Sequence, residues 1–261
     1  MDRLMPGAGQ ARSKGRHDQR LQRQREWRPA EPLLYSLRGY RYCALLLSRG
    51  RASEAHDWAT QTMDLAHRSD RLLDVALNRL TLGRVHLALA LAKRGSGPSP
   101  GAPAVDARVA TDTGLDEAVE AQRSAGRNEH ICGGLLVRAA FRRAVGDWDG
   151  AKRDLNEAKE IAEPGLMRLY WCDCALEGAR LALAPREAFA PLAGLVERSP
   201  PPPVPPEVAA VASLNEEARK ELDVARKLIA ECGYHRRDEE LAELDVVVAG
   251  GRRFADLPPR V

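Results

Sequence analysis

Apolar residues recur at helical spacing on both sides of one glycine in the stretch from 134 to 163. The dipeptide Gly146-Asp147 interrupts the first run, and a second amphipathic run follows it directly. Because glycine readily adopts the left-handed conformation that ends a helix, the pattern predicts a helical hairpin with one buried seam. The seam positions are Leu136, Ala139, Ala140, Ala144, Ala151, Leu155, Ala158 and Ala162.

Similar apolar stripes predict helices along most of the remaining chain. Thr113 with Asp116, and Ser213 with Glu216, have the spacing of capping boxes at helix starts. Glycines close several of the stripes, as Gly146 does in the central stretch. The predicted helices outside that stretch cover about residues 33–48, 52–68, 70–93, 113–125, 166–184, 213–232 and 234–248.

The chain therefore divides into a helical region with two insertions and two polar ends. Helical hairpins cover residues 33–249, with flexible insertions at about 94–112 and 185–212. The insertions are rich in Gly, Ser and Pro, which favour loops and stiff spacers over packed elements. Residues 1–32 form a basic arm that has almost nothing apolar to bury, so we expect disorder there. We expect residues 250–261 to be a frayed tail.

The central hairpin resembles one tetratricopeptide repeat (TPR), with Gly146, Ala151, Leu155 and Ala158 at the intervals of that family. The step from Ala118 to Ala151 is close to the TPR length of about 34 residues. This resemblance implies an all-α fold: a right-handed α-solenoid of about four TPR-like helical hairpins plus a C-terminal capping helix. Stacked hairpins would bury a continuous core. Small residues occupy the equivalent place in all four hairpins: Ala55, Ala118, Ala151 and Ala218.

Three segments are also similar to TPR regions of bacterial multidomain signalling ATPases. They read LLYSLRGYRYCALLL, LLDVALNRLTLGRVHLALA and GYHRRDEELAEL. In such proteins the repeats act as a sensor or scaffold beside the ATPase. The resemblance therefore implies a standalone scaffold, or the detached regulatory half of such a protein, since no nucleotide-binding motif occurs here.

Composition supports a helical protein with a sizeable core. Hydrophobic residues make up 44% and aromatic residues only 5%, which suits helices with small-residue contacts. Because Lys and Arg number 40 against 37 Asp and Glu, the net charge of +3 gives little reason to expect nucleic acid. We find no leader-like apolar core and no apolar run long enough for a membrane span. The cysteine count, five, is odd, and a reducing cytoplasm is the expected setting.

A search for catalytic and metal-binding motifs gives no strong candidate. The chain has no phosphate-binding loop, no HExxH, no GxSxG and no paired CxxC. Cys172 and Cys174 would point about 200° apart on a helix, so one ion cannot easily bind both. His130 and Cys132 suggest a thiol–imidazole pair at a helix start, but no third group orients it. We therefore expect no enzyme activity, no cofactor and no bound metal.

Basic residues mark the first helices of the predicted hairpins at positions outside the apolar stripe. Arginine binds carboxylates through two parallel hydrogen bonds, so a basic stripe on the concave face would suit an extended acidic peptide. The alternative is that these arginines pair with Asp and Glu from the outer helices. The candidate peptide-binding residues are Arg38, Arg41, Tyr42, Asn78, Arg79, Arg84, Arg138, Arg142 and Arg168.

The sequence thus favours a noncatalytic scaffold or sensor module that binds another protein or peptide on the concave face of a repeat array. The partner would be a protein or an acidic peptide, and we expect neither a membrane nor nucleic acid as partner. A second hypothesis is a nucleic-acid-associated regulator that uses the basic arm, residues 1–32.

Overall fold

The structure of the chain is a computed structural model that describes residues 36–68, 71–93, 104–184 and 207–252, together with 254 and 257. Within these residues every regular element is helical, as the apolar periodicity predicted. The elements are α2 (Ser36–Leu47), α3 (Ala52–Arg68), α4 (Leu72–Lys93), α5 (Ala104–Ser124), α6 (Asn128–Val145), α7 (Trp148–Ala162), α8 (Arg168–Leu183), α10 (Glu207–Cys232), the 3₁₀ turn η3 (His235–Arg237) and α11 (Asp238–Val248).

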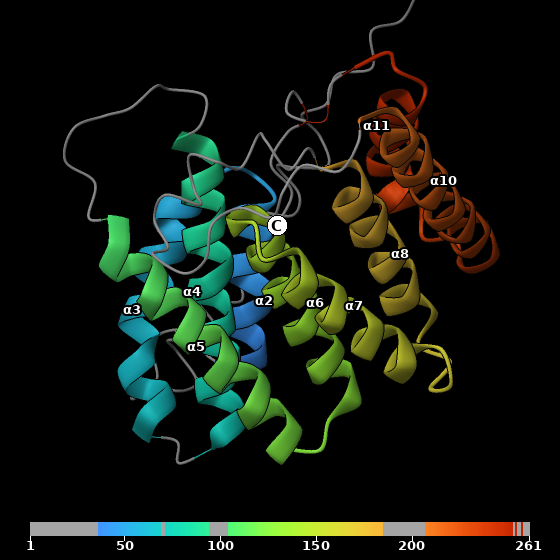
Figure 1. The fold of residues 1–261 in the computed structure, drawn as a ribbon. Coiled ribbons are helices and arrows are strands. Elements are labelled where there is room, and N and C mark those ends of the chain that lie inside the picture. The colour runs from blue at the N-terminus through green and yellow to red at the C-terminus, as the bar shows by residue number, and fades with distance from the viewer. Residues whose placement is uncertain are drawn as a thin grey trace, which may run out of the picture.

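Each helix packs against its neighbours in the chain, and the helices follow one another across the molecule (Figure 1). A second set of contacts joins every other helix: α2 packs on α4, α4 on α6, α6 on α8, and α8 on α11. We call α2, α4, α6 and α8 the first-helix layer, and α3, α5, α7 and α10 the second-helix layer. The first-helix layer is therefore continuous from the beginning of the described chain to α11.

The four alanines at equivalent hairpin positions all lie in helix–helix contacts. Ala55, Ala118, Ala151 and Ala218 are each no more than 1% exposed. A side chain of one methyl group lets two helix backbones approach closely, and a larger group there would push the helices apart. The sequence pattern that suggested a repeat therefore marks buried contact points in all four helix pairs.

The turn inside the central hairpin forms as the sequence predicted. Gly146 has φ of 86°, in the left-handed region, and its N–H group is directed at the carbonyls of Arg142 and Arg143 at the end of α6. Asp147 then accepts a hydrogen bond from the Gly150 N–H at 2.9 Å and so caps α7. A glycine with positive φ also follows α2, α5 and α10.

Two helices begin earlier than predicted, and the insertions are correspondingly shorter. α5 begins at Ala104 and α10 at Glu207, so parts of the predicted loops 94–112 and 185–212 are helical. The capping-box residues Thr113 and Ser213 consequently lie inside helices. Both upstream segments are rich in alanine, whose helix propensity outweighs a local capping signal. The remaining loop residues lie outside the described chain, as does the predicted basic arm, 1–32.

Two residues of the segment 250–261, which was predicted to be a frayed tail, pack against the helices. After α11, Gly250 turns the chain with φ of 76°. Phe254 and Leu257 are then partly buried, because they pack against a core cluster shared by α8, α10 and α11. No helix in the described part of the chain combines the length and the apolar character needed to cross a membrane.

Candidate interaction face and its charge networks

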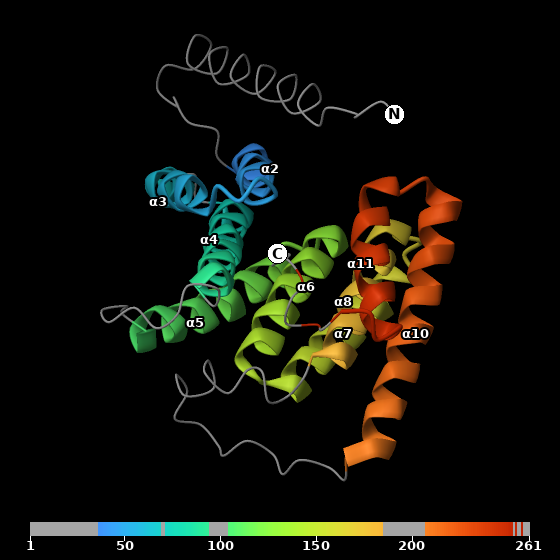
Figure 2. The same cartoon turned by 90° about the horizontal axis from the view of Figure 1, so that it is seen from above.

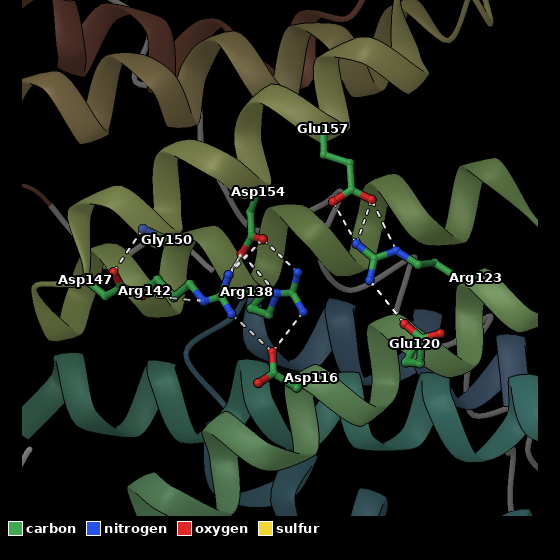
Figure 3. Close-up of polar contacts among 9 residues, drawn as sticks. All are labelled: Asp116, Glu120, Arg123, Arg138, Arg142, Asp147, Gly150, Asp154 and Glu157. Atoms are coloured by element: carbon green, nitrogen blue, oxygen red, sulfur yellow. Dashed lines mark hydrogen bonds and ion pairs between the residues drawn. The ribbon is translucent and has the colours of Figure 1, made fainter. Parts of the chain in front are cut away.

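Two of the nine candidate residues, Arg138 and Arg142, point away from the first-helix layer and toward α5 and α7 (Figure 3). Arg138 donates from Nε and Nη2 to the two oxygens of Asp154, at 3.0 and 2.7 Å, and from Nη1 to Asp116 at 2.8 Å. Arg142 donates to both oxygens of Asp154 at 2.9 Å and to Asp116 at 3.2 Å. We call these four residues the central network.

The helical period explains why both arginines reach the same carboxylates. Residues four apart lie on one face of a helix, so Arg138 and Arg142 project together from α6. Asp154 lies opposite them on α7, with a side chain only 3% exposed, whereas the Asp116 side chain on α5 is 52% exposed. The network therefore ties the hairpin α6–α7 to the preceding hairpin and has one edge in solvent.

Arg79 and Arg168 are also paired with acids of the second-helix layer. Arg79 contacts Glu117 of α5, and Arg168 lies 3.2 Å from Glu231 of α10. The alternative considered for the basic stripe, in which arginines pair with acids of neighbouring helices, thus describes four of the nine candidates.

Three further candidates make contacts within the first hairpin or between it and α4. Asn78 donates a hydrogen bond to the Ala59 carbonyl at 2.8 Å. The ring of Tyr42 packs edge-on against Trp58, with centroids 4.6 Å apart. The guanidinium of Arg84 lies 5.6 Å from the Tyr40 ring centroid, close enough for a cation–π contact.

The last two candidates, Arg38 and Arg41, are exposed on α2. Arg41 is close enough to His130 of α6 to help lower the pKa of that histidine, although burial is the larger cause. Tyr40 of α2 likewise acts on Tyr170 of α8, whose pKa is raised to about 12, chiefly by burial. Groups of α2 therefore act electrostatically on groups of α6 and α8. We call Tyr40, Arg41, His130 and Tyr170 the inner-face cluster.

The inner-face cluster was largely missed from the sequence. His130 was considered there only as a partner of Cys132, and the two tyrosines were not singled out as ligand contacts. Tyr170 lies against the α6 backbone, since a Cβ atom on Gly133 would be 3.8 Å from its ring. The sequence signal for this contact is the small residue Gly133 on α6, which leaves room for the Tyr170 ring of α8.

Four of the five cysteines are buried. The Cys132 thiol donates to the Ala158 carbonyl at 3.7 Å, and burial raises its pKa to about 11. Cys172 packs in the cluster shared by α8, α10 and α11, while Cys174 packs in a different cluster beside Leu135. The prediction that these two cysteines point apart is confirmed. No group of three or more potential metal ligands occurs among the described residues.

A second charge network lies at the C-terminal end. Arg143 donates to Glu177 at 2.6 Å, and Arg180 lies 3.5 Å from the same carboxylate and 2.5 Å from Glu240. Arg237 extends this series of ion pairs, because it lies 2.7 Å from Glu240 and 2.9 Å from Asp173. Positive and negative groups alternate across α6, α8, η3 and α11. We call the set the C-terminal network: Arg143, Glu177, Arg180, Glu240, Arg237 and Asp173.

Comparisons with protein-family models, with curated proteins and with solved structures found no match for this chain.

Proposed function

We propose that this chain is a noncatalytic scaffold that binds another protein or a peptide on the inner face of its first-helix layer. The observation that carries this proposal is the single-file packing, in which each helix contacts its chain neighbours and α2, α4, α6 and α8 also contact one another. An array of this kind presents one long continuous surface, which suits an extended partner.

The same packing supports a right-handed solenoid of the TPR type. The four buried alanines occupy equivalent positions, and the order of contacts is that of consecutive helix pairs stacked in one direction. Direct contact within the first-helix layer favours that layer as the concave side, because helices on the inside of a curved stack lie closest together. The proposal for binding depends on this assignment.

The inner-face cluster supports a partner that combines negative charge with flat or apolar groups. Arg38 and Arg41 carry exposed positive charge on α2. Tyr40 and Tyr170 add partly exposed aromatic rings from α2 and α8. A carboxylate could bind the guanidinium groups while neighbouring side chains cover the rings. Arg138 is excluded from this role because Asp154 and Asp116 already neutralise it.

The buried thiols favour a binding protein over a thiol enzyme. Nucleophilic cysteines need a thiolate, and burial raises the pKa of Cys132 to about 11 and that of Cys172 to about 12. Both thiols are therefore protonated at neutral pH.

Charge reversal on the inner face tests the proposal. The variant Arg38→Glu/Arg41→Glu changes only exposed residues of α2, so helicity should be preserved. Partners captured from the native cell by the unaltered protein should be lost from this variant. The matched control, Arg153→Glu/Lys220→Glu, places the same charge change on exposed positions of α7 and α10 and should retain them. Equal capture by both variants would overturn the proposal.

A further inference from the structure

The turn between α7 and α8 holds a leucine in a conformation that glycine usually adopts. Glycines with positive φ follow α2, α5, α6, α10 and α11. After α7 the residue with positive φ is Leu166, at 53°, although Gly165 directly precedes it. The left-handed conformation crowds the Cβ atom of every residue other than glycine, so Leu166 costs conformational energy at this turn.

Burial of the side chain does not offset this strain. Leu166 is 79% exposed, the largest value among the large apolar residues of the described chain. Leu169, three positions later at the start of α8, is 46% exposed. Strained non-glycine residues cluster at functional sites, and neighbouring exposed apolar groups mark interaction surfaces. The turn therefore has two features of a contact surface that the packing of this chain does not explain.

A pair of opposite charges lies beside the leucines. Arg168 stands between them in the sequence, and its Nη1 donates to Oε2 of Glu231, at the end of α10, at 3.2 Å. The two side chains are 52% and 40% exposed. Figure 2 shows α10 beside α8, at the end of the molecule opposite to α2 and α3. We call Leu166, Arg168, Leu169 and Glu231 the α8 tip.

The two charged groups of the α8 tip can bind further partners of opposite charge. A guanidinium has five N–H donors in a planar arrangement, and a carboxylate accepts hydrogen bonds at both of its oxygens. An acidic peptide, which suits Arg38 and Arg41 of α2, would be repelled here by Glu231. The α8 tip therefore suits a partner surface that is apolar and carries one charge of each sign.

A second copy of this chain offers a surface of that composition. In a dimer with two-fold symmetry the same surface faces itself, and residue pairs across the interface occur twice. An axis that passes between Arg168 and Glu231 and along the leucines places each arginine opposite the partner's Glu231. The same axis places leucine against leucine, which removes the exposed apolar groups from water.

We infer that the chain forms a two-fold homodimer through the α8 tip. Four side chains form the centre of the contact, so it is small, and small contacts are typical of weak association that depends on concentration. The inference goes beyond the proposed function, because it assigns a self-association surface at the end of the array opposite to α2.

Sedimentation equilibrium of the full chain, over about a hundredfold range of concentration, tests the inference. The weight-average mass should rise from the monomer value toward twice that value. Leu166→Gly should weaken dimerisation by about tenfold or more. Glycine fits this turn without strain, so the variant keeps its fold. The matched control, Leu72→Gly, removes a leucine that is 62% exposed at the start of α4 and should dimerise like the unaltered chain. A monomer at every concentration, or equal weakening in both variants, would contradict the inference.

Two charge reversals distinguish pairing between copies from pairing within one chain. Arg168→Glu alone and Glu231→Arg alone each place like charges opposite one another across the axis, so each should weaken dimerisation. In an equimolar mixture of the two variants, opposite charges face each other in both pairs, and the dimer should return. Within each variant chain the like charges stay side by side, so a purely intramolecular pair predicts no recovery. A mixture that stays monomeric would rule out the proposed interface.

The variant Arg38→Glu/Arg41→Glu separates this inference from the proposed function. It should dimerise like the unaltered chain while it loses the captured partners. If it keeps those partners and still dimerises, the binding face on α2 is wrong and the α8 tip stands. If it loses them and the unaltered chain is monomeric, only the dimer is wrong. Loss of dimerisation in this variant would place the contact on α2 and contradict the inference.

Discussion

Arg142 and Arg143 are adjacent on α6 and yet belong to two different charge networks. Arg142 turns toward α7 and α5 and joins the central network, which reaches solvent through Asp116. Arg143 turns toward α8 and joins the C-terminal network, where its side chain and that of Glu177 are each 7% exposed. Successive side chains on a helix diverge by about 100°, so one step along α6 separates the two environments.

The two networks also differ in how far they reach along the chain. Arg138 and Asp154 are 16 residues apart and belong to one hairpin. In the C-terminal network Arg143 and Glu177 are 34 residues apart, and Arg237 and Asp173 are 64 apart. The central network therefore fixes the geometry within and just before a hairpin, whereas the C-terminal network fixes how α11 closes the array. Buried pairs of this kind add little net stability but strongly penalise the loss of one partner.

The largest effect is expected from Asp154→Ala in the central network. Two arginines share this buried carboxylate, and its removal leaves Arg138 buried with only Asp116 to pair with. We expect a loss of about 3–5 kcal/mol in the free energy of unfolding, measured by urea denaturation. The matched control, Asp116→Ala, removes a half-exposed acid and should cost less than about 1 kcal/mol. Equal losses in the two variants would show that burial of the acid does not determine how much it contributes to the free energy of unfolding.

A smaller and more local effect is expected from Glu240→Ala in the C-terminal network. Arg180 retains Glu177, and Arg237 retains Asp173, so neither arginine is left without an acid. We expect a loss of about 2 kcal/mol, since a buried charged hydrogen-bond partner is still removed. Amide hydrogen exchange should quicken in α11 and the adjoining part of α8 while α6 and α7 keep their protection. Uniform loosening of all helices would contradict the separation of the two networks.

The fold was largely predictable because its signals are local. Apolar periodicity gave the helix pairs, and Gly146 and the buried alanines marked the turn and the close contacts. The starts of α5 and α10 were misplaced because Thr113 and Ser213 look like caps when read in isolation. Where such a helix begins depends on the sequence upstream of the cap-like residue, and alanine is frequent there in both helices.

The two charge networks were predicted less well. Helical periodicity shows which face of a helix carries a side chain, but it does not show which residue that side chain contacts. Arg138 and Arg142 were expected on an open face of their helix, whereas Arg138 is buried and both long side chains reach acids on α5 and α7. The C-terminal network depends on pairs far apart in the sequence, so no local pattern could reveal it. Both networks follow from tertiary packing.

The N-terminal end differs from the two charge networks, because two histidine rings, from α3 and α4, lie next to each other there. The His56 and His86 rings have centroids 5.8 Å apart. Burial, aided by His56, lowers the pKa of His86 below its ordinary value of 6.5. Below about pH 6.5 the unfolded chain therefore binds more protons than the folded one. The free energy of unfolding keeps its full value above about pH 6.5 and decreases as the pH falls below it. His86→Gln should flatten the dependence of unfolding free energy on pH between 7 and 5.

His56→Gln is the control for that experiment, because it removes the neighbouring ring, whose side chain is 41% exposed, and leaves His86 in place. It should leave most of the acid sensitivity in place. An unchanged pH profile in His86→Gln would assign the acid sensitivity to other groups, among which His130 has a pKa lowered in the same direction by burial.

The smallest effect is expected where a charge pair lies at the surface of the second-helix layer. Arg123 of α5 donates to both oxygens of Glu157 of α7 at 2.7 Å, and each side chain is 37% exposed (Figure 3). Water also solvates both groups in the folded protein, so Arg123→Ala should cost only about 0.5–1 kcal/mol in urea denaturation. The cost should shrink further in 1 M salt, where charges are screened within about 3 Å. Asp154→Ala should keep most of its cost in the same salt, because its partners are shielded from ions. If salt reduced both costs equally, the distinction between a buried network and a surface pair would not hold for this protein.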